Sequence, residues 1–349
     1  MGLPQIIIDF KTKGVSAISR SKRGDAALVF TKDGLLEPFG KTYKNAEECT
    51  DLEGETKTFA ELCFSQSPKS VTVFILPETE GKASLSSHEK FLEGFDYNWI
   101  GFCTDALEGE NIAAFVKKMR DKGRYIKAVS HLDYAFDSEA VVALGGAEVT
   151  LTSVSGGAKC LVPLITGCAA AAALGESLTY KRLTAVTGYT LSGEENDLIE
   201  DGKLVLIRDE QGYKIARGIN SLVSDSGSGE FKKIKIIETM DTIRADIKSS
   251  LESSYIGRVK NDYDSKLLLC AAISGYLEGL GDSVIDSSYK NYVGVSLEMQ
   301  RQYLTEHGID TENMSDTEIL KANTGSSVFL EAKVRFVDAM EDIVFTLEM

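Results

Sequence analysis

Short apolar runs and helical segments alternate over the first half of the chain. Runs typical of buried strands occupy residues 26–31, 71–76, 99–103, 125–129, 141–144 and 148–151. Segments with helical spacing lie at residues 57–64, 84–93, 110–122 and 163–174. In the clearest of them, four apolar side chains share one helical face: Ile112, Phe115, Val116 and Met119. Strands separated by helices predict a partly parallel α/β domain over residues 21–180.

Residues 181–225 have a different character, with shorter apolar runs and more turn residues. Strands are expected at residues 189–191, 203–208 and 213–216. Glu210-Gln211-Gly212 separates the last two and predicts a hairpin turn. We therefore expect a small β-rich segment, followed by a flexible joint at residues 225–229.

Residues 226–337 predict an α+β domain. A strand is expected at residues 231–237, followed by helices at 241–253 and 264–279. The second helix has an expected apolar face of Leu267, Leu268, Ala271 and Leu277. Ser315 and Glu318 form a capping box that opens a short helix ending at Ala322. A strand at residues 328–337 completes the domain.

Both ends of the chain are apolar and strand-like. The N-terminal strand is predicted over Ile6, Ile7, Ile8, Asp9 and Phe10, and the C-terminal strand over Ile343, Val344, Phe345, Thr346 and Leu347. Residues 1–20 and 338–349 are therefore treated as terminal arms, with polar joints at 11–14 and 338–342. Such strands either fold back on their own domain or exchange between subunits, since both arrangements satisfy their backbone groups.

Composition narrows the class of protein. Of 349 residues, 43% are hydrophobic and 26% charged, as in ordinary globular proteins, and the net charge is −15. This acidity argues against a general binder of nucleic acid or anionic membranes. No apolar run reaches 18 residues, which predicts no membrane insertion. The first residues lack the basic region of a signal peptide, so none is expected.

Candidate chemistry is sparse. The six cysteines form no CxxC pair and are expected to be free, buried thiols, and the three histidines share no metal-ligand spacing. No phosphate-binding loop or G-x-G-x-x-G motif follows a predicted strand. The acidic pairs Glu194-Glu195 and Glu341-Asp342 are read as solvated turns. We therefore predict no catalytic, cofactor or metal residues. The α/β pattern leaves one alternative, a Rossmann-like nucleotide-binding enzyme with an unorthodox phosphate loop.

Positive charge concentrates only at Lys232, Lys233 and Lys235. In a strand, Lys233 and Lys235 would share one face. The run is then either a solvated strand edge protected by lysine or a contact to an acidic partner surface.

An ordered series of segments resembles the contractile-tail sheath proteins of bacteriophages and R-type bacteriocins, most of all the short sheaths of Gram-positive phages. The series comprises Gly175-Glu176-Ser177-Leu178-Thr179-Tyr180, Gly218-Ile219-Asn220-Ser221-Leu222, Phe231-Lys232-Lys233-Ile234, Met240-Asp241-Thr242-Ile243, Tyr255-Ile256-Gly257-Arg258-Val259-Lys260-Asn261, Asn323-Thr324-Gly325-Ser326, Val328-Phe329-Leu330 and Asp338-Ala339-Met340-Glu341-Asp342-Ile343. The match is specific over residues 175–349. Over residues 21–174 it rests on the order of the elements.

The resemblance implies a non-enzymatic virion or particle component with a multidomain sheath fold, α/β plus α+β, and extended strand arms at both termini. It implies stacked hexameric rings of this chain around an inner tail tube, with baseplate and tail terminator proteins as further partners. It also implies assembly in the bacterial host cytoplasm and contraction that drives the tube through an envelope. In such a family the arms add strands to neighbouring subunits. A static oligomeric shell or tube protein is the third reading that the sequence leaves open.

Overall fold

The computed structural model describes residues 24–224 and 229–347, which fall into two compact units. The body unit comprises the described residues up to Asp241 together with 339–347, and the C-terminal unit comprises residues 242–338. The predicted N-terminal strand, Ile6 to Phe10, and most of the predicted joint at 225–229 lie outside the described residues.

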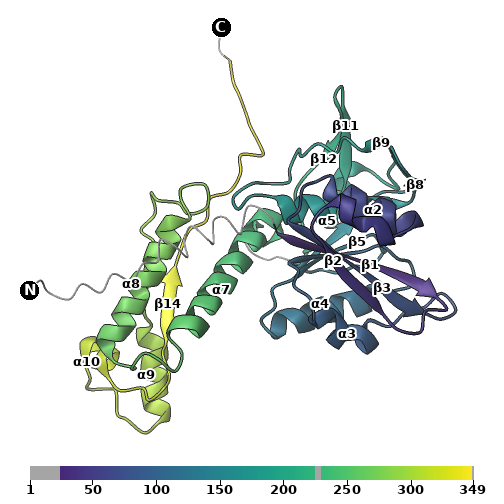
Figure 1. Cartoon of the computed structure of the whole chain (residues 1–349). Helices are drawn as coiled ribbons and strands as arrows, with labels where there is room; N and C mark the ends of the chain where they lie inside the picture. The colour runs from purple at the N-terminus through teal and green to yellow at the C-terminus, as the bar shows by residue number, and fades with distance from the viewer. Residues whose placement is uncertain (1–23, 225–228, 348–349) are drawn as a thin grey trace, which may run out of the picture. The chain divides into compact units, whose positions relative to one another are not determined.

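A seven-stranded sheet forms the centre of the body unit, in the order β10-β6-β5-β4-β1-β3-β2 (Figure 1). Six strands are parallel: β1 (Asp25–Asp33), β3 (Ser70–Glu78), β4 (Trp99–Phe102), β5 (Lys127–Ser130), β6 (Val141–Leu144) and β10 (Lys203–Leu204). Only β2 (Phe39–Tyr43) pairs in the antiparallel direction, at one edge of the sheet. The mostly parallel α/β layer predicted from the alternating pattern is confirmed.

Helices cover both faces of this sheet. One face carries α2 (Gly54–Phe64) and α5 (Val162–Ala171), and the opposite face carries α3 (Leu85–Glu93) and α4 (Gly109–Asp121) (Figure 1). Along β1, Leu28 packs into the core under α2 and α5, whereas its neighbour Val29 packs into the core under α3 and α4. A strand buried on both faces accounts for the unbroken apolar runs in the sequence.

Small antiparallel sheets complete the body unit. β7 (Val149–Leu151) pairs with both β8 (Ser155–Gly156) and β9 (Val186–Tyr189), and β11 (Leu206–Asp209) forms the predicted hairpin with β12 (Gly212–Ile215). The strand expected at 203–208 is divided, because β10 joins the large sheet and β11 joins the hairpin. Three short helical segments lie among these elements: η1 (Ala46–Asp51), η2 (Ala158–Leu161) and α6 (Glu195–Glu200).

Residues 231–237 are not the predicted strand. The segment forms the short turn η3 (Glu230–Lys232) and the start of the long helix α7 (Ile234–Ser254). Ile234, Ile236 and Ile237 are buried, and so is Lys235, so the first turn of α7 has no exposed side. Periodicity cannot separate a short buried helix from a buried strand, and this is why the prediction was wrong.

The C-terminal unit combines helices with a two-stranded sheet. Its elements after α7 are α8 (Tyr263–Gly279), β13 (Tyr292–Val295), α9 (Leu297–Glu306), α10 (Asp316–Lys321) and β14 (Leu330–Lys333) (Figure 1). The capping box at Ser315 and Glu318 opens α10 as predicted. β13 and β14 pair in the antiparallel direction, so the strand expected at 328–337 is shorter than predicted.

The predicted apolar face of α8 is wrong for three of its four residues, and Leu277 is buried as predicted. Leu268 is 59% exposed and Leu267 is also exposed, whereas Lys266, Leu269 and Cys270 are buried. The helix carries apolar residues around most of its circumference, so its sequence does not specify the buried side. Packing selects the side on which Lys266 finds hydrogen-bond acceptors.

Two general expectations can be compared with the described residues. All six cysteines are free and buried, as predicted. Among the helices that the structure describes, none combines the length and apolarity needed to cross a bilayer.

Candidate functional site

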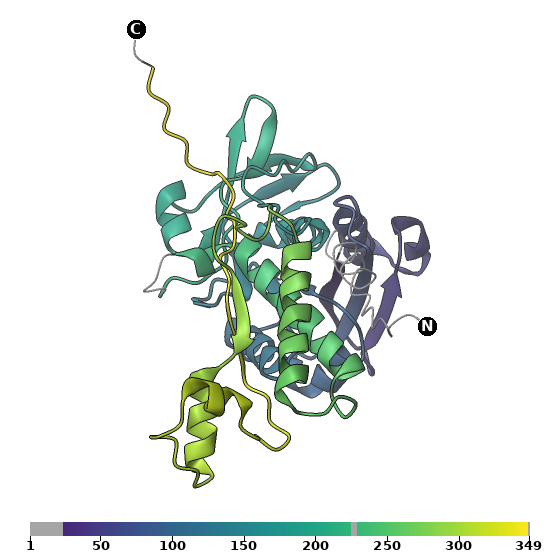
Figure 2. The same cartoon turned by 90° about the vertical axis from the view of Figure 1, so that its left-hand side faces the viewer.

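The C-terminal segment is extended and strongly apolar. Residues 339–347 form no strand with the described part of this chain, and they run outward as an extended trace (Figures 1 and 2). Its large apolar side chains are exposed: Ile343, Val344, Phe345 and Leu347. In β geometry, Ile343, Phe345 and Leu347 would line one face of the segment. The predicted strand at 343–347 therefore pairs with none of residues 24–224 and 229–347, and its pairing with another chain stays a prediction.

The start of this segment, around Glu341, is bound to the rest of the body unit. The side chain of Glu341 is only 8% exposed, in contrast to the solvated turn predicted from the sequence. Its Oε1 atom accepts hydrogen bonds from Ser177 Oγ at 2.9 Å and Thr179 Oγ1 at 2.7 Å. Residues 338–342 are thus not a uniformly flexible joint, because one carboxylate is fixed in place.

Basic side chains face the other oxygen of Glu341. Arg217 Nη1 lies 3.5 Å and Lys233 Nζ 3.7 Å from Oε2, and Arg217 Nη2 donates to Asp342 Oδ1 at 2.5 Å. That last bond lowers the pKa of Asp342 and raises the pKa of Arg217. We call Ser177, Thr179, Arg217 and Lys233 the Glu341 site.

The Glu341 site was missed by the sequence reasoning, although a signal was present. The site and the carboxylate that it holds come from four segments that carry the family resemblance or lie next to one. Ser177 and Thr179 belong to the first, Arg217 directly precedes Gly218 of the second, Lys233 belongs to the third and Glu341 to the fourth. Segments separated by up to 164 residues therefore meet at one carboxylate.

The three lysines proposed as contacts occupy different environments. Lys232 ends η3, Lys233 belongs to the Glu341 site, and Lys235 is buried in the first turn of α7. The expectation that Lys233 and Lys235 share a strand face is wrong, because this segment is helical. Asn220 holds the turn η3 in place: its Nδ2 donates to the Phe231 carbonyl at 2.7 Å, and its backbone N–H donates to the Lys232 carbonyl at 2.8 Å.

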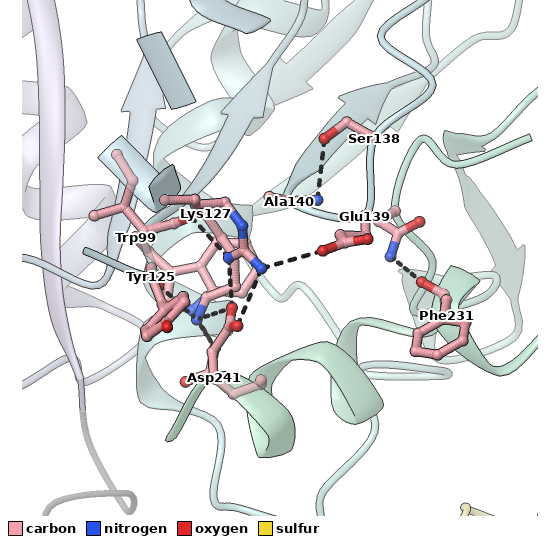
Figure 3. Close-up of polar contacts among 12 residues, drawn as sticks. Trp99, Tyr125, Lys127, Ser138, Glu139, Ala140, Phe231 and Asp241 are labelled. Atoms are coloured by element: carbon pink, nitrogen blue, oxygen red, sulfur yellow. Dashed lines mark hydrogen bonds and ion pairs between the residues drawn. The ribbon is translucent and has the colours of Figure 1, made fainter. Parts of the chain in front are cut away.

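A second buried charge cluster fixes the start of α7 to the body unit (Figure 3). Asp241 is 2% exposed and pairs with Arg120 Nη1 at 2.6 Å and Lys127 Nζ at 3.5 Å. Lys127, 3% exposed, also lies 2.7 Å from Glu238, whose other contact is Trp99 Nε1 at 3.0 Å. Burial opposes protonation of Arg120, but its bonds to Asp241 raise its pKa overall.

The C-terminal unit has a polar core of its own. Lys266 Nζ donates to Gln300 Oε1 and Thr324 Oγ1, both at 3.1 Å. Asn261 Nδ2 donates to Thr324 Oγ1 at 3.2 Å and to the Gly325 carbonyl at 2.8 Å. Two further segments of the family resemblance, around Asn261 and Thr324, thus come together here. Burial lowers the pKa of Lys266.

These clusters join distant segments of the same chain to one another, as structural contacts do. Within residues 24–224 and 229–347, no group of three His, Cys, Asp or Glu side chains is placed to hold a metal ion. Each buried cation described above is already engaged by a carboxylate, a carbonyl oxygen or a hydroxyl of this same chain.

Comparisons with known proteins identify the family. The phage tail sheath C-terminal domain family matches residues 227–349. The chain is 30% identical to the tail sheath protein of Clostridium phage phiCD119, over all of this chain and 99% of that protein.

Solved structures share the fold. The sheath tail protein of Listeria innocua superposes with a TM-score of 0.66 at 16% identity, covering 85% of this chain and 94% of its own. The contracted helical sheath of the anti-feeding prophage gives 0.69 at 13% identity, covering 100% of this chain and 99% of that one. Nothing in these comparisons supports the enzyme alternative, and the predicted sheath-protein fold of α/β plus α+β domains is confirmed. This chain belongs to the family of phage tail sheath proteins, which are structural components of contractile tails and not enzymes.

Proposed function

We propose that this chain polymerises into stacked hexameric rings around an inner tail tube and contracts to drive that tube through a cell envelope. The comparisons that support this include a sheath in its contracted state and a baseplate assembly of the anti-feeding prophage. Baseplate and tail terminator proteins are the further partners, and assembly takes place in the bacterial host cytoplasm.

Both terminal arms add strands to neighbouring subunits in this proposal. The observation that carries it is the C-terminal segment, whose large apolar side chains are exposed on both faces of an extended backbone that pairs with no described strand of its own chain. Ladder hydrogen bonds would satisfy that backbone, and a neighbouring sheet would cover the side chains. The N-terminal arm, Ile6 to Phe10, is proposed on its sequence alternation alone.

Of the three lysines, Lys232 is the best placed for a contact to the tube or a neighbouring subunit. It is only partly buried, at the exposed turn η3, whereas Lys235 is buried within its own chain and Lys233 pairs with Glu341. We therefore rank Lys232 first in this proposal.

Aspartate substitutions in the C-terminal arm test the proposed strand addition. A charge directed into a strand interface blocks edge pairing, so Val344→Asp combined with Phe345→Asp is expected to abolish tubes and rings in negative-stain micrographs. The matched control is Leu36→Asp, since Leu36 is 94% and Val344 95% exposed. Circular dichroism should show an unchanged fold in both variants. Polymers that persist in the arm variant would contradict strand addition at the C-terminus.

A further inference from the structure

The Glu341 site has a consequence for how far the C-terminal arm can move. We infer that Glu341 anchors the root of the arm to its own body unit before and after assembly, so that the exchanged portion begins at Ile343. The inference rests on the proposed strand addition and specifies which residues take part in it.

A sharp change in burial along the segment supports this division. Met340 is 93% and Ile343 79% exposed, and the Asp342 side chain is 75% exposed, yet the Glu341 side chain between them is 8% exposed. One side chain out of four is thus inserted into the body unit. A buried carboxylate with two hydroxyl donors and two cations is costly to withdraw, because both hydroxyls lose an acceptor and both cations lose a buried counter-charge.

The hydroxyls of the Glu341 site are oriented by the body unit itself. The Thr179 backbone N–H donates to Ser177 Oγ at 3.1 Å, and the Gly218 backbone N–H donates to Thr179 Oγ1 at 2.9 Å. Each oxygen accepts a backbone hydrogen bond, so its own hydrogen can point to Glu341 Oε1. The backbone around residues 177–179 and 218 therefore forms a site suited to one carboxylate, independent of the residues beyond 342.

Anchoring sets the reach of the arm. An extended strand rises about 3.3 Å per residue, so Leu347, six residues beyond Glu341, can lie at most about 20 Å from the anchor. A neighbouring sheet edge that accepts the arm must stay within that distance of the donor's Glu341 site in every state of the polymer. The anchor thus limits how far two linked subunits can separate.

Spin-label distances test the anchor directly. One label is placed at Met340→Cys and the other at Ser153→Cys, an exposed position between β7 and β8 of the same unit. The six native thiols are buried, so unmodified protein serves as the labelling control. Labelled chains are diluted into unlabelled chains to suppress distances between subunits. We expect one narrow distance distribution, identical below the onset of polymerisation and in the polymer.

Two alanine variants show whether the narrow distance distribution depends on Glu341. Glu341→Ala should broaden the distribution in unassembled protein, whereas Glu210→Ala, at the exposed turn between β11 and β12, should leave it narrow. A distribution that shifts on assembly, or that stays narrow in Glu341→Ala, would overturn the anchor.

Deleting residues 343–349 separates this inference from the proposed function. If the truncated chain still polymerises with the label at 340 fixed, strand addition at this end fails while the anchor stands. If truncation abolishes polymers but the wild-type distance changes on assembly, strand addition stands and the anchor fails.

Discussion

Two acidic residues carry an unusual share of the contacts at the edges of the body unit. Asp241 fixes the start of α7 to Arg120 and Lys127, and Glu341 fixes the C-terminal segment to the Glu341 site. Both lie beside the points where the chain passes between the two units. Each carboxylate is buried and pairs with two basic side chains, so its loss removes a buried counter-charge from both of them. Arg120, Lys127 and Arg217 keep Glu139, Glu238 and Asp342 as other partners.

Asp241→Asn tests this dependence. Removing one partner of a buried ion pair costs about 3–5 kcal/mol, so the free energy of unfolding of the unassembled protein should fall by about 3 kcal/mol. Urea denaturation measures the change. The control is Glu139→Gln, which removes a partner of the same Arg120 from a site where the carboxylate side chain is 44% exposed. An exposed pair is worth about 0–1 kcal/mol, so equal losses in the two variants would contradict the argument.

The buried Lys266 should make the stability of the folded chain depend on pH. Burial lowers its pKa, so between that value and the ordinary one near 10.4 the unfolded chain binds a proton that the folded chain has released. Stability should therefore rise with pH through this window. Urea midpoints measured from about pH 7 to pH 10 should show the rise in wild type and in the exposed-site control Lys248→Met, and lose it in Lys266→Met. A rise of equal size in Lys266→Met would assign it to another group.

At the scale of elements, glycine allows the backbones of two helices to pack closely where a larger residue would clash. A Cβ atom built on Gly167 of α5 would lie 2.5 Å from the Cys63 carbonyl oxygen of α2, whereas one on Gly275 of α8 would meet nothing within 4 Å. Both residues lie within helices, so the same substitution tests packing against helix propensity.

The paired glycine variants should change stability in opposite directions. Gly167→Ala forces α2 and α5 apart, with an expected loss of about 1–3 kcal/mol. Gly275→Ala gains helix propensity, about 0.5–1 kcal/mol, because no atom of the described residues lies within 4 Å of the added methyl group. Thermal and urea unfolding of unassembled protein measure both. Stabilisation by Gly167→Ala would show that the helices can separate without loss.

At the scale of the whole molecule, charge acts between copies. Each chain carries a net charge of −15, and a sheath stacks many chains in close contact. Like charges repel over a Debye length of about 10 Å at 0.1 M salt and about 3 Å at 1 M. Repulsion between subunits should therefore weaken as salt is added, while strand ladders and apolar contacts remain.

Salt dependence of assembly follows from this balance. The lowest protein concentration that yields polymers, measured by sedimentation, should fall as sodium chloride is raised from about 0.05 M to about 0.5 M. The control is the arm variant Val344→Asp/Phe345→Asp, which should stay unassembled throughout. A threshold that is unchanged or rises with salt would indicate that attractive ion pairs, not net repulsion, control assembly.

The sequence by itself determined much of the body unit. The single apolar face of residues 110–122 allows only a helix, and the short run at 71–76, rich in β-branched residues and followed by Pro77, favours a buried strand. The capping box at Ser315 could also be predicted, because its hydrogen bonds join residues only three positions apart. The ordered segments over residues 175–349 also pointed to the sheath family.

Only the tertiary structure decided features that depend on distant partners. Residues 234–237 are all buried in the first turn of α7, so their apolar run did not distinguish helix from strand. In α8, Lys266 turns inward because Gln300 and Thr324 accept its hydrogen bonds. Glu341 resembled a solvated acid until Ser177 and Thr179, more than 160 residues earlier, were brought to it. Local pattern specifies the period of an element, but burial and polar satisfaction depend on neighbours that only the folded chain supplies.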